Sequence, residues 1–151
     1  MAASNQLYSW AALNQDIPAA TVNKVISAKS SLLDEMGIYQ HHDAVTGTAR
    51  QDVADDYAFR LHKALKKNHE AYGEVTDILL EKFAGLSSNS TWQFCERTNG
   101  TYLDCPIREF KRVDDNELFV ALHNPSSLEY AALPAIQVPD GHFRVMQWSF
   151  D

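Results

Sequence analysis

The chain has no long apolar run and no excess of basic residues, and each shortage argues against a class of protein. Its 13 lysines and arginines stand against 20 aspartates and glutamates, giving a formal net charge of −7. A surface without basic excess cannot neutralise phosphates, which argues against nucleic-acid binding. No apolar run approaches the roughly 20 residues of a membrane-spanning helix. Residues 1–10 lack the basic and apolar segments of a signal peptide.

What is present is ordinary globular composition, 45% hydrophobic and 22% charged, in a chain of 151 residues. This is enough for one domain or two small ones. Helical periodicity dominates up to about residue 85, and strand and loop patterns follow after about residue 91. The sequence therefore predicts an α+β chain with a helical bundle over residues 1–86. Residues 87–151 are expected to form a loop region and the first strands of a β domain.

Two long helices are expected in the first part. One begins with Asp16 as N-cap and Pro18 in the first turn. Its apolar stripe contains Val22, Val25, Ile26, Leu32, Leu33, Met36 and Tyr39. The other begins at a capping box formed by Thr48 and Gln51 and stops at Gly85. Its apolar face contains Val53, Tyr57, Leu61, Leu65, Tyr72, Val75, Leu79 and Phe83.

Strands are expected at residues 118–122, 131–138 and 143–148, the first closed by an Asn-Pro turn. Successive strands without helices between them indicate an antiparallel sheet or sandwich. Three strands do not complete a sandwich. We therefore expect the chain to be a fragment of a larger multidomain protein.

The most unusual string is the His-His-Asp run at residues 41–43. Imidazole nitrogens and carboxylate oxygens are zinc ligands, although a zinc site needs roughly three or four of them from the protein. The plainer interpretation is a polar helix terminus, where imidazolium is favoured by the helix dipole. Adjacent helical side chains also diverge by about 100°, so only one of the two histidines should point at a given site. The other histidines are expected at the surface or the edge of the core: His62, His69, His123 and His142.

The same region resembles a known family. Residues 33–48 read LDEMGIYQHHDAVTGT and residues 50–57 read RQDVADDY. This long signature is similar to the middle domain of glycoside hydrolase family 38, the class II alpha-mannosidases of lysosomal type. Weaker likeness runs on to the cysteine-bounded stretch at residues 94–106 and to residues 119–125.

The resemblance implies a retaining, zinc-dependent hydrolase of terminal alpha-linked mannose in glycans. It implies that His42 is a zinc ligand and that Asp43 contacts the sugar. The nucleophile, the acid/base carboxylate and the other zinc ligands would belong to an N-terminal α/β domain, so no catalytic residue is expected in this chain. The implied partners are that domain, the remaining C-terminal β domains and a mannose-containing glycan. The chain alone is expected to be inactive.

Two features bear on the compartment. Asn89 and Asn99 begin glycosylation sequons, and Cys95 and Cys105 enclose a short loop around the second one. In a reducing cytosol the cysteines would be ordinary thiols. Together with the sequons they favour a disulfide and two glycans in a lysosome, a secretory lumen or the extracellular space.

Two functional hypotheses remain open on the sequence. One is a segment of an active alpha-mannosidase, which the intact His42-Asp43 pair favours. The other is a non-catalytic structural or assembly module derived from such an enzyme and held within a larger complex.

Overall fold

A computed structural model describes residues 1–85, 92–97, 103–104, 120–128, 141–142 and 144. The chain divides into two compact units, Met1–Ser88 and Asn89–Asp151. The first unit is helical and carries the candidate site. Among the described residues, no helix combines the length and apolar character needed to cross a membrane.

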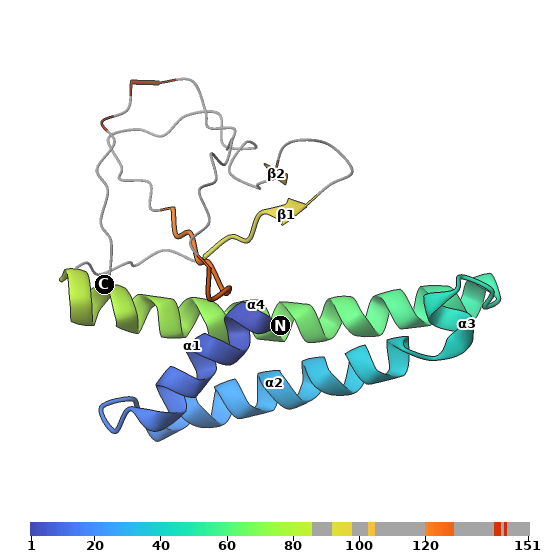
Figure 1. Cartoon of the computed structure of the whole chain (residues 1–151), viewed down its shortest axis with the longest axis horizontal. Coiled ribbons are helices and arrows are strands. Elements are labelled where there is room, and N and C mark those ends of the chain that lie inside the picture. The colour runs from blue at the N-terminus through green and yellow to red at the C-terminus, as the bar shows by residue number, and fades with distance from the viewer. Residues whose placement is uncertain (86–91, 98–102, 105–119, 129–140, 143, 145–151) are drawn as a thin grey trace. The chain divides into compact units, whose positions relative to one another are not determined.

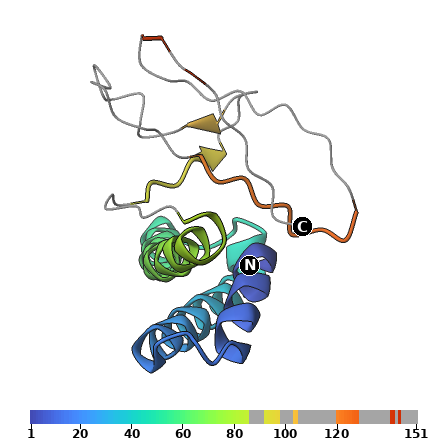
Figure 2. The same ribbon diagram turned by 90° about the vertical axis from the view of Figure 1, so that its left-hand side faces the viewer.

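The helical unit is built on two long antiparallel helices. α2 (Ala19–Tyr39) and α4 (Gln51–Ala84) lie side by side, and the one-turn helix α3 (His42–Val45) joins them at one end (Figure 1). α1 (Ala2–Leu13) packs against both (Figure 2). The helical part of the α+β expectation is therefore confirmed. α4 is unbroken through Asn68 and Gly73, although both are weak helix formers.

The core lies where the three helices meet. Val25 and Val75 are 2% and 0% exposed, and the cluster also holds Leu7, Tyr8, Ala11, Ile17, Ala28 and Ala71. Burial is confined to a narrow stripe because, in the part of the chain that the structure describes, α2 packs mainly against α4 and less extensively against α1. Ile26 and Leu33, which belong to the expected stripe of α2, are 54% and 47% exposed.

A buried polar cluster ties α1 to α4. The Tyr8 hydroxyl lies 2.9 Å from both the backbone oxygen and the side-chain oxygen of Asn68. The Asn68 amide in turn donates to the Ser4 hydroxyl at 3.1 Å. Burial, with a smaller contribution from nearby Tyr72, raises the pKa of Tyr8 well above its usual value, so the phenol stays a donor. Asn68 is a weak helix former, but its side chain suits the middle of α4 because it makes hydrogen bonds with the buried hydroxyls of Tyr8 and Ser4.

The helix ends differ from expectation at both N-termini. The N-cap of α2 is Pro18, and Asp16 instead pairs with Lys82 at 2.8 Å. The N-cap of α4 is Arg50 without a side-chain cap. The expected capping box is wrong because the Thr48 hydroxyl donates to Asp43 instead. The expected stop at Gly85 is confirmed, with the glycine in the left-handed conformation at φ 64°.

The described part of the second unit contains two short strands, β1 (Glu96–Arg97) and β2 (Leu103–Asp104). They pair antiparallel, with Glu96 opposite Asp104. Residues 120–122, from the first expected strand, are exposed and form no strand. The turn after them is present, since the Asn124 side chain accepts the Ser126 amide at 3.0 Å. The other residues of the expected strands lie outside the described part, apart from Arg144, which is not in a strand.

Candidate metal and sugar site at the His42 loop

The candidate site is the connection between α2 and α4. After α2 ends, the His41 amide donates to the Ile38 carbonyl, and His41 then turns the chain into α3 as its N-cap. Gly47, at φ 73°, reverses the chain after α3. A side chain at that φ is strained, so glycine suits the position. The loop is thereby folded back on itself at the end of the bundle.

Three potential ligands gather in this loop. His41, His42 and Asp43 each offer one atom within 4.8 Å of the others. The two imidazole rings lie 4.4 Å apart, and His42 Nε2 is 3.5 Å from Asp43 Oδ2. The expected divergence of the histidines is wrong. His41 has φ −52° and ψ 138°, which is not helical, so the 100° rotation between helical neighbours does not apply.

Each of the three residues has its own anchor. The Tyr57 hydroxyl on α4 lies 3.2 Å from His41 Nδ1. The Thr48 hydroxyl donates to Asp43 Oδ1 at 2.9 Å, and the amides of Thr48 and Ala49 both donate to the Asp43 carbonyl. The Thr46 hydroxyl donates to the His42 carbonyl. The loop conformation therefore rests on polar bonds rather than on apolar burial.

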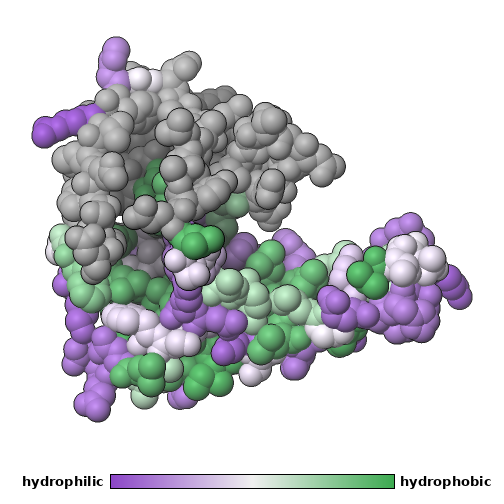
Figure 3. Space-filling view, viewed as in Figure 1, coloured by the Kyte–Doolittle hydropathy of each residue, from purple (hydrophilic) through white to green (hydrophobic). Residues whose placement is uncertain are grey.

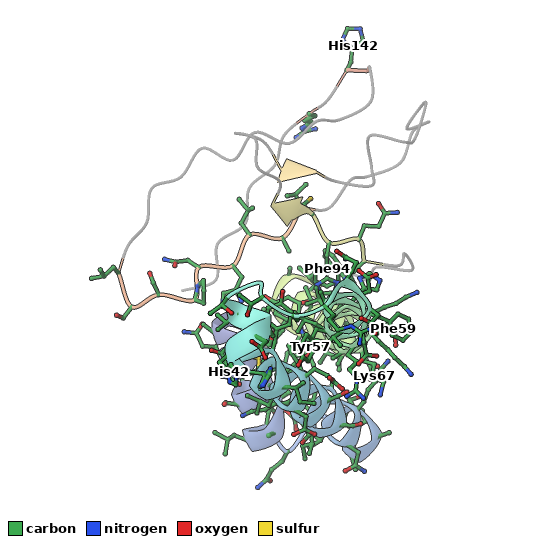
Figure 4. The ribbon with its side chains drawn as sticks, turned by 90° about the vertical axis from the view of Figure 1, so that its right-hand side faces the viewer. His42, Tyr57, Phe59, Lys67, Phe94 and His142 are labelled. Carbon is green, nitrogen blue, oxygen red and sulfur yellow. The ribbon has the colours of Figure 1, made fainter. Side chains whose placement is uncertain are left out.

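The His42 side chain is more open than that of Asp43. It is 83% exposed, against 45% for Asp43. Figure 4 views the bundle from its α3 end and shows His42 there (Figure 4). A nitrogen and oxygen donor set of this kind suits zinc, but three residues of one short loop do not surround an ion. The residues fit one side of a zinc shell that other groups would complete.

The remaining predicted site residues lie in the second unit. Cys95 directly precedes β1. Cys105, Asn89 and Asn99 lie outside the described residues, so the disulfide and both glycans stay predictions. A shallow hollow of about 440 Å³ in the helical unit is lined by the end of α1 and the start of the α1–α2 connection, and not by the His42 loop.

Sequence reasoning missed the anchors of the loop. Thr48 was assigned to a helix cap and Tyr57 to an apolar face, yet both bond to the His-His-Asp run. The only signal for Thr48 was its place in the small-residue turn after Asp43, which fits a local carboxylate–hydroxyl bond as well as a cap. Tyr57 carried no such signal, because its partner is 16 residues away.

Comparison with known proteins places this loop inside a matched region. The family model described as the alpha mannosidase middle domain matches residues 2–79. A probable alpha-mannosidase from Arabidopsis thaliana is 34% identical over 120 residues, which is 76% of this chain and 11% of that protein. The lysosomal alpha-mannosidase of Mus musculus is 33% identical over 131 residues, which is 85% of this chain and 12% of that protein.

The alpha-mannosidase of Canavalia ensiformis is similar to the same degree, at 33% identity over 117 residues, covering 76% of this chain and 12% of that protein. The chain therefore spans only about an eighth of the length of these relatives. No solved structure matches the chain.

Proposed function

The chain belongs to the alpha mannosidase middle domain family, and from this premise we propose that it is a segment of a retaining, zinc-dependent alpha-mannosidase. The substrate is the terminal alpha-linked mannose of glycans. One observation carries the proposal: within the matched region, His42 and Asp43 stand side by side, anchored and open, at one end of the bundle. This exposed pair favours a segment of an active enzyme over a module kept only for assembly.

His42 is the zinc ligand in this proposal, and Asp43 accepts a hydrogen bond from a sugar hydroxyl. His41 is less suited, because its ring is tied to Tyr57, whereas the His42 side chain is 83% exposed and has the Asp43 carboxylate beside its Nε2. Zinc bound here would act as a Lewis acid that positions vicinal sugar hydroxyls. The chain's own contribution is one ligand and one oriented carboxylate.

The rest of the catalytic site has to come from other domains. A retaining glycosidase needs two carboxyl groups about 5–5.5 Å apart as nucleophile and acid/base. We assign these to an N-terminal α/β domain, with β domains following the helical unit. The surface near His42 supports such contacts: Ile38, Val45 and Val53 are 40%, 61% and 38% exposed although apolar. Apolar residues are also exposed along the visible face of the helical unit (Figure 3).

The proposed compartment is the lysosome or another lumenal or extracellular space. Two relatives, from Mus musculus and Cavia porcellus, are named lysosomal alpha-mannosidases. The strand register supports a disulfide, because β1 and β2 pair residue 96 with 104 and 97 with 103. In the sequence, Cys95 directly precedes β1 and Cys105 directly follows β2, so the two cysteines flank the paired strands.

Peptide mapping of the native protein without reduction tests the disulfide and the glycan at Asn99 together. We expect one peptide pair linked through Cys95 and Cys105, with a glycan on the enclosed loop. Closing so short a loop should stabilise the unit by about 2–3 kcal/mol. Recovery of two alkylated thiols would contradict the pairing and the compartment with it.

The functional proposal is tested by assaying an aryl alpha-mannoside with zinc. The purified chain should show no turnover, and co-expression with the N-terminal α/β domain of a family member should restore it. Turnover by the isolated chain would refute the division of the site. Stable assembly without activity, despite an intact His42 and Asp43, would favour the non-catalytic module.

A further inference from the structure

Asp43 is bonded twice to a single residue. The Thr48 amide donates to the Asp43 backbone carbonyl at 3.0 Å, and the Thr48 hydroxyl donates to Oδ1 of the carboxylate at 2.9 Å. The other oxygen, Oδ2, lies 3.5 Å from His42 Nε2. Thr48 thus holds Oδ1 of the carboxylate, while Oδ2 lies beside His42, the proposed zinc ligand.

The donor in this contact is unambiguous. An ionised carboxylate can only accept, so the proton belongs to Thr48. The hydroxyl of Thr46 lies 2.9 Å from that of Thr48 and also contacts the His42 carbonyl. Since the single Thr48 proton points to Asp43 and the single Thr46 proton points to the His42 carbonyl, each threonine is committed to one member of the pair. The two threonines therefore hold both members of the His42-Asp43 pair from the same turn.

Burial does not hold the Asp43 side chain in place. It is 45% exposed, and within the described residues its carboxylate contacts only Thr48 and His42. A half-exposed aspartate without the hydroxyl bond would exchange between rotamers, which costs orientation toward a ligand. Charge-assisted bonds of this kind are stronger than neutral ones. The hydroxyl is thus the contact that selects one rotamer.

We propose that Thr48 is a positioning residue, whose hydroxyl fixes the Asp43 carboxylate in the orientation needed to bind a sugar hydroxyl. This rests on the proposed mannosidase function. It assigns Thr48 a role through Asp43 and no contact with substrate. Groups that orient a functional side chain in this way typically change affinity or activity by about 10- to 100-fold when removed.

The first arm of the test measures the Asp43 rotamer directly, in the 151-residue chain, by three-bond NMR couplings that report its χ1 angle. Thr48→Val keeps the branched shape and removes the hydroxyl, and Thr48→Ser keeps the hydroxyl. We expect one rotamer in the wild type and in Thr48→Ser, and averaged couplings in Thr48→Val. Unaveraged couplings in Thr48→Val would overturn the proposal.

The matched control is Thr21→Val. Thr21 also donates to a carboxylate, that of Glu74 at 2.6 Å, but between α2 and α4. This variant should lower the unfolding midpoint and leave the Asp43 couplings unchanged. Thr48→Val should leave the unfolding midpoint unchanged and average the Asp43 couplings. If both variants average the Asp43 couplings, the effect is general loosening of the bundle and the positioning role is refuted.

The second arm uses the complete mannosidase that contains this segment. Thr48→Val should lower kcat/KM for an aryl alpha-mannoside by about 10- to 100-fold, with Thr48→Ser near wild type. If Thr48→Val averages the Asp43 couplings but leaves kcat/KM unchanged, the functional role of Thr48 is refuted. Absence of zinc-dependent turnover in the wild type would instead refute the proposed function, and the couplings would still decide whether Thr48 holds Asp43.

Discussion

Replacing Tyr8 by phenylalanine should destabilise the bundle although it removes a single oxygen atom. Tyr8 is 2% exposed, and its hydroxyl is the donor to the side-chain oxygen of Asn68, which is itself 5% exposed. The phenylalanine ring refills the space, so almost no cavity forms. The change leaves a buried amide oxygen without its donor, which costs about 1–3 kcal/mol.

Urea unfolding followed by the helical circular dichroism signal measures this effect. With a denaturant dependence of about 1–3 kcal/mol per molar, a loss of about 2 kcal/mol lowers the midpoint by about 1 M. The control is Tyr39→Phe, which removes the same atom from a residue that is 36% exposed. Its hydroxyl has no hydrogen-bond partner among the described residues, so its midpoint should stay within experimental error of the wild type. Equal midpoints for Tyr8→Phe and Tyr39→Phe would refute the role of the buried cluster.

Three further predictions concern the helix pair, the loop and the interior of α2. Hydrogen bonds from Lys24 and then Thr21 lower the pKa of Glu74 below its ordinary 4.5. The bundle should therefore lose stability as pH falls below about 4.5, and Glu74→Gln should flatten that loss in acid unfolding; an unchanged pH profile would contradict it. Gly47→Ala, at φ 73°, should lower the unfolding free energy by about 1–2 kcal/mol. Gly37→Ala, inside α2 with open space around it, should raise it by about 0.5–1 kcal/mol; shifts of the same sign would refute this account.

The sequence predicted the helical unit well because the signal was local. Regular apolar spacing and Gly85 gave two long helices and the end of the second. The predicted N-termini of these helices were wrong, because Asp16 pairs with Lys82 and Thr48 donates to Asp43 instead of capping a helix. A capping pattern indicates which hydrogen bonds a side chain can make at the helix end, but it does not reveal other groups that compete for the same side chain.

The site was predicted in part for the same reason. The family signature pointed to His42 and Asp43, and both lie together in the loop. The close approach of His41 was unforeseen, because it depends on a backbone turn between α2 and α3 and on Tyr57 from α4. Such a contact follows from tertiary packing, which no spacing rule contains. In the second unit, the predicted Asn-Pro turn is present, but residues 120–122 form no strand.

The most direct test of the account is the zinc content of the complete protein after two single replacements, measured by elemental mass spectrometry. His42→Ala should lose zinc and mannosidase activity, because it removes the open ligand. His41→Ala, which removes the ring tied to Tyr57, should retain the metal. Loss of zinc in His41→Ala together with full zinc in His42→Ala would contradict the assignment of the metal ligand.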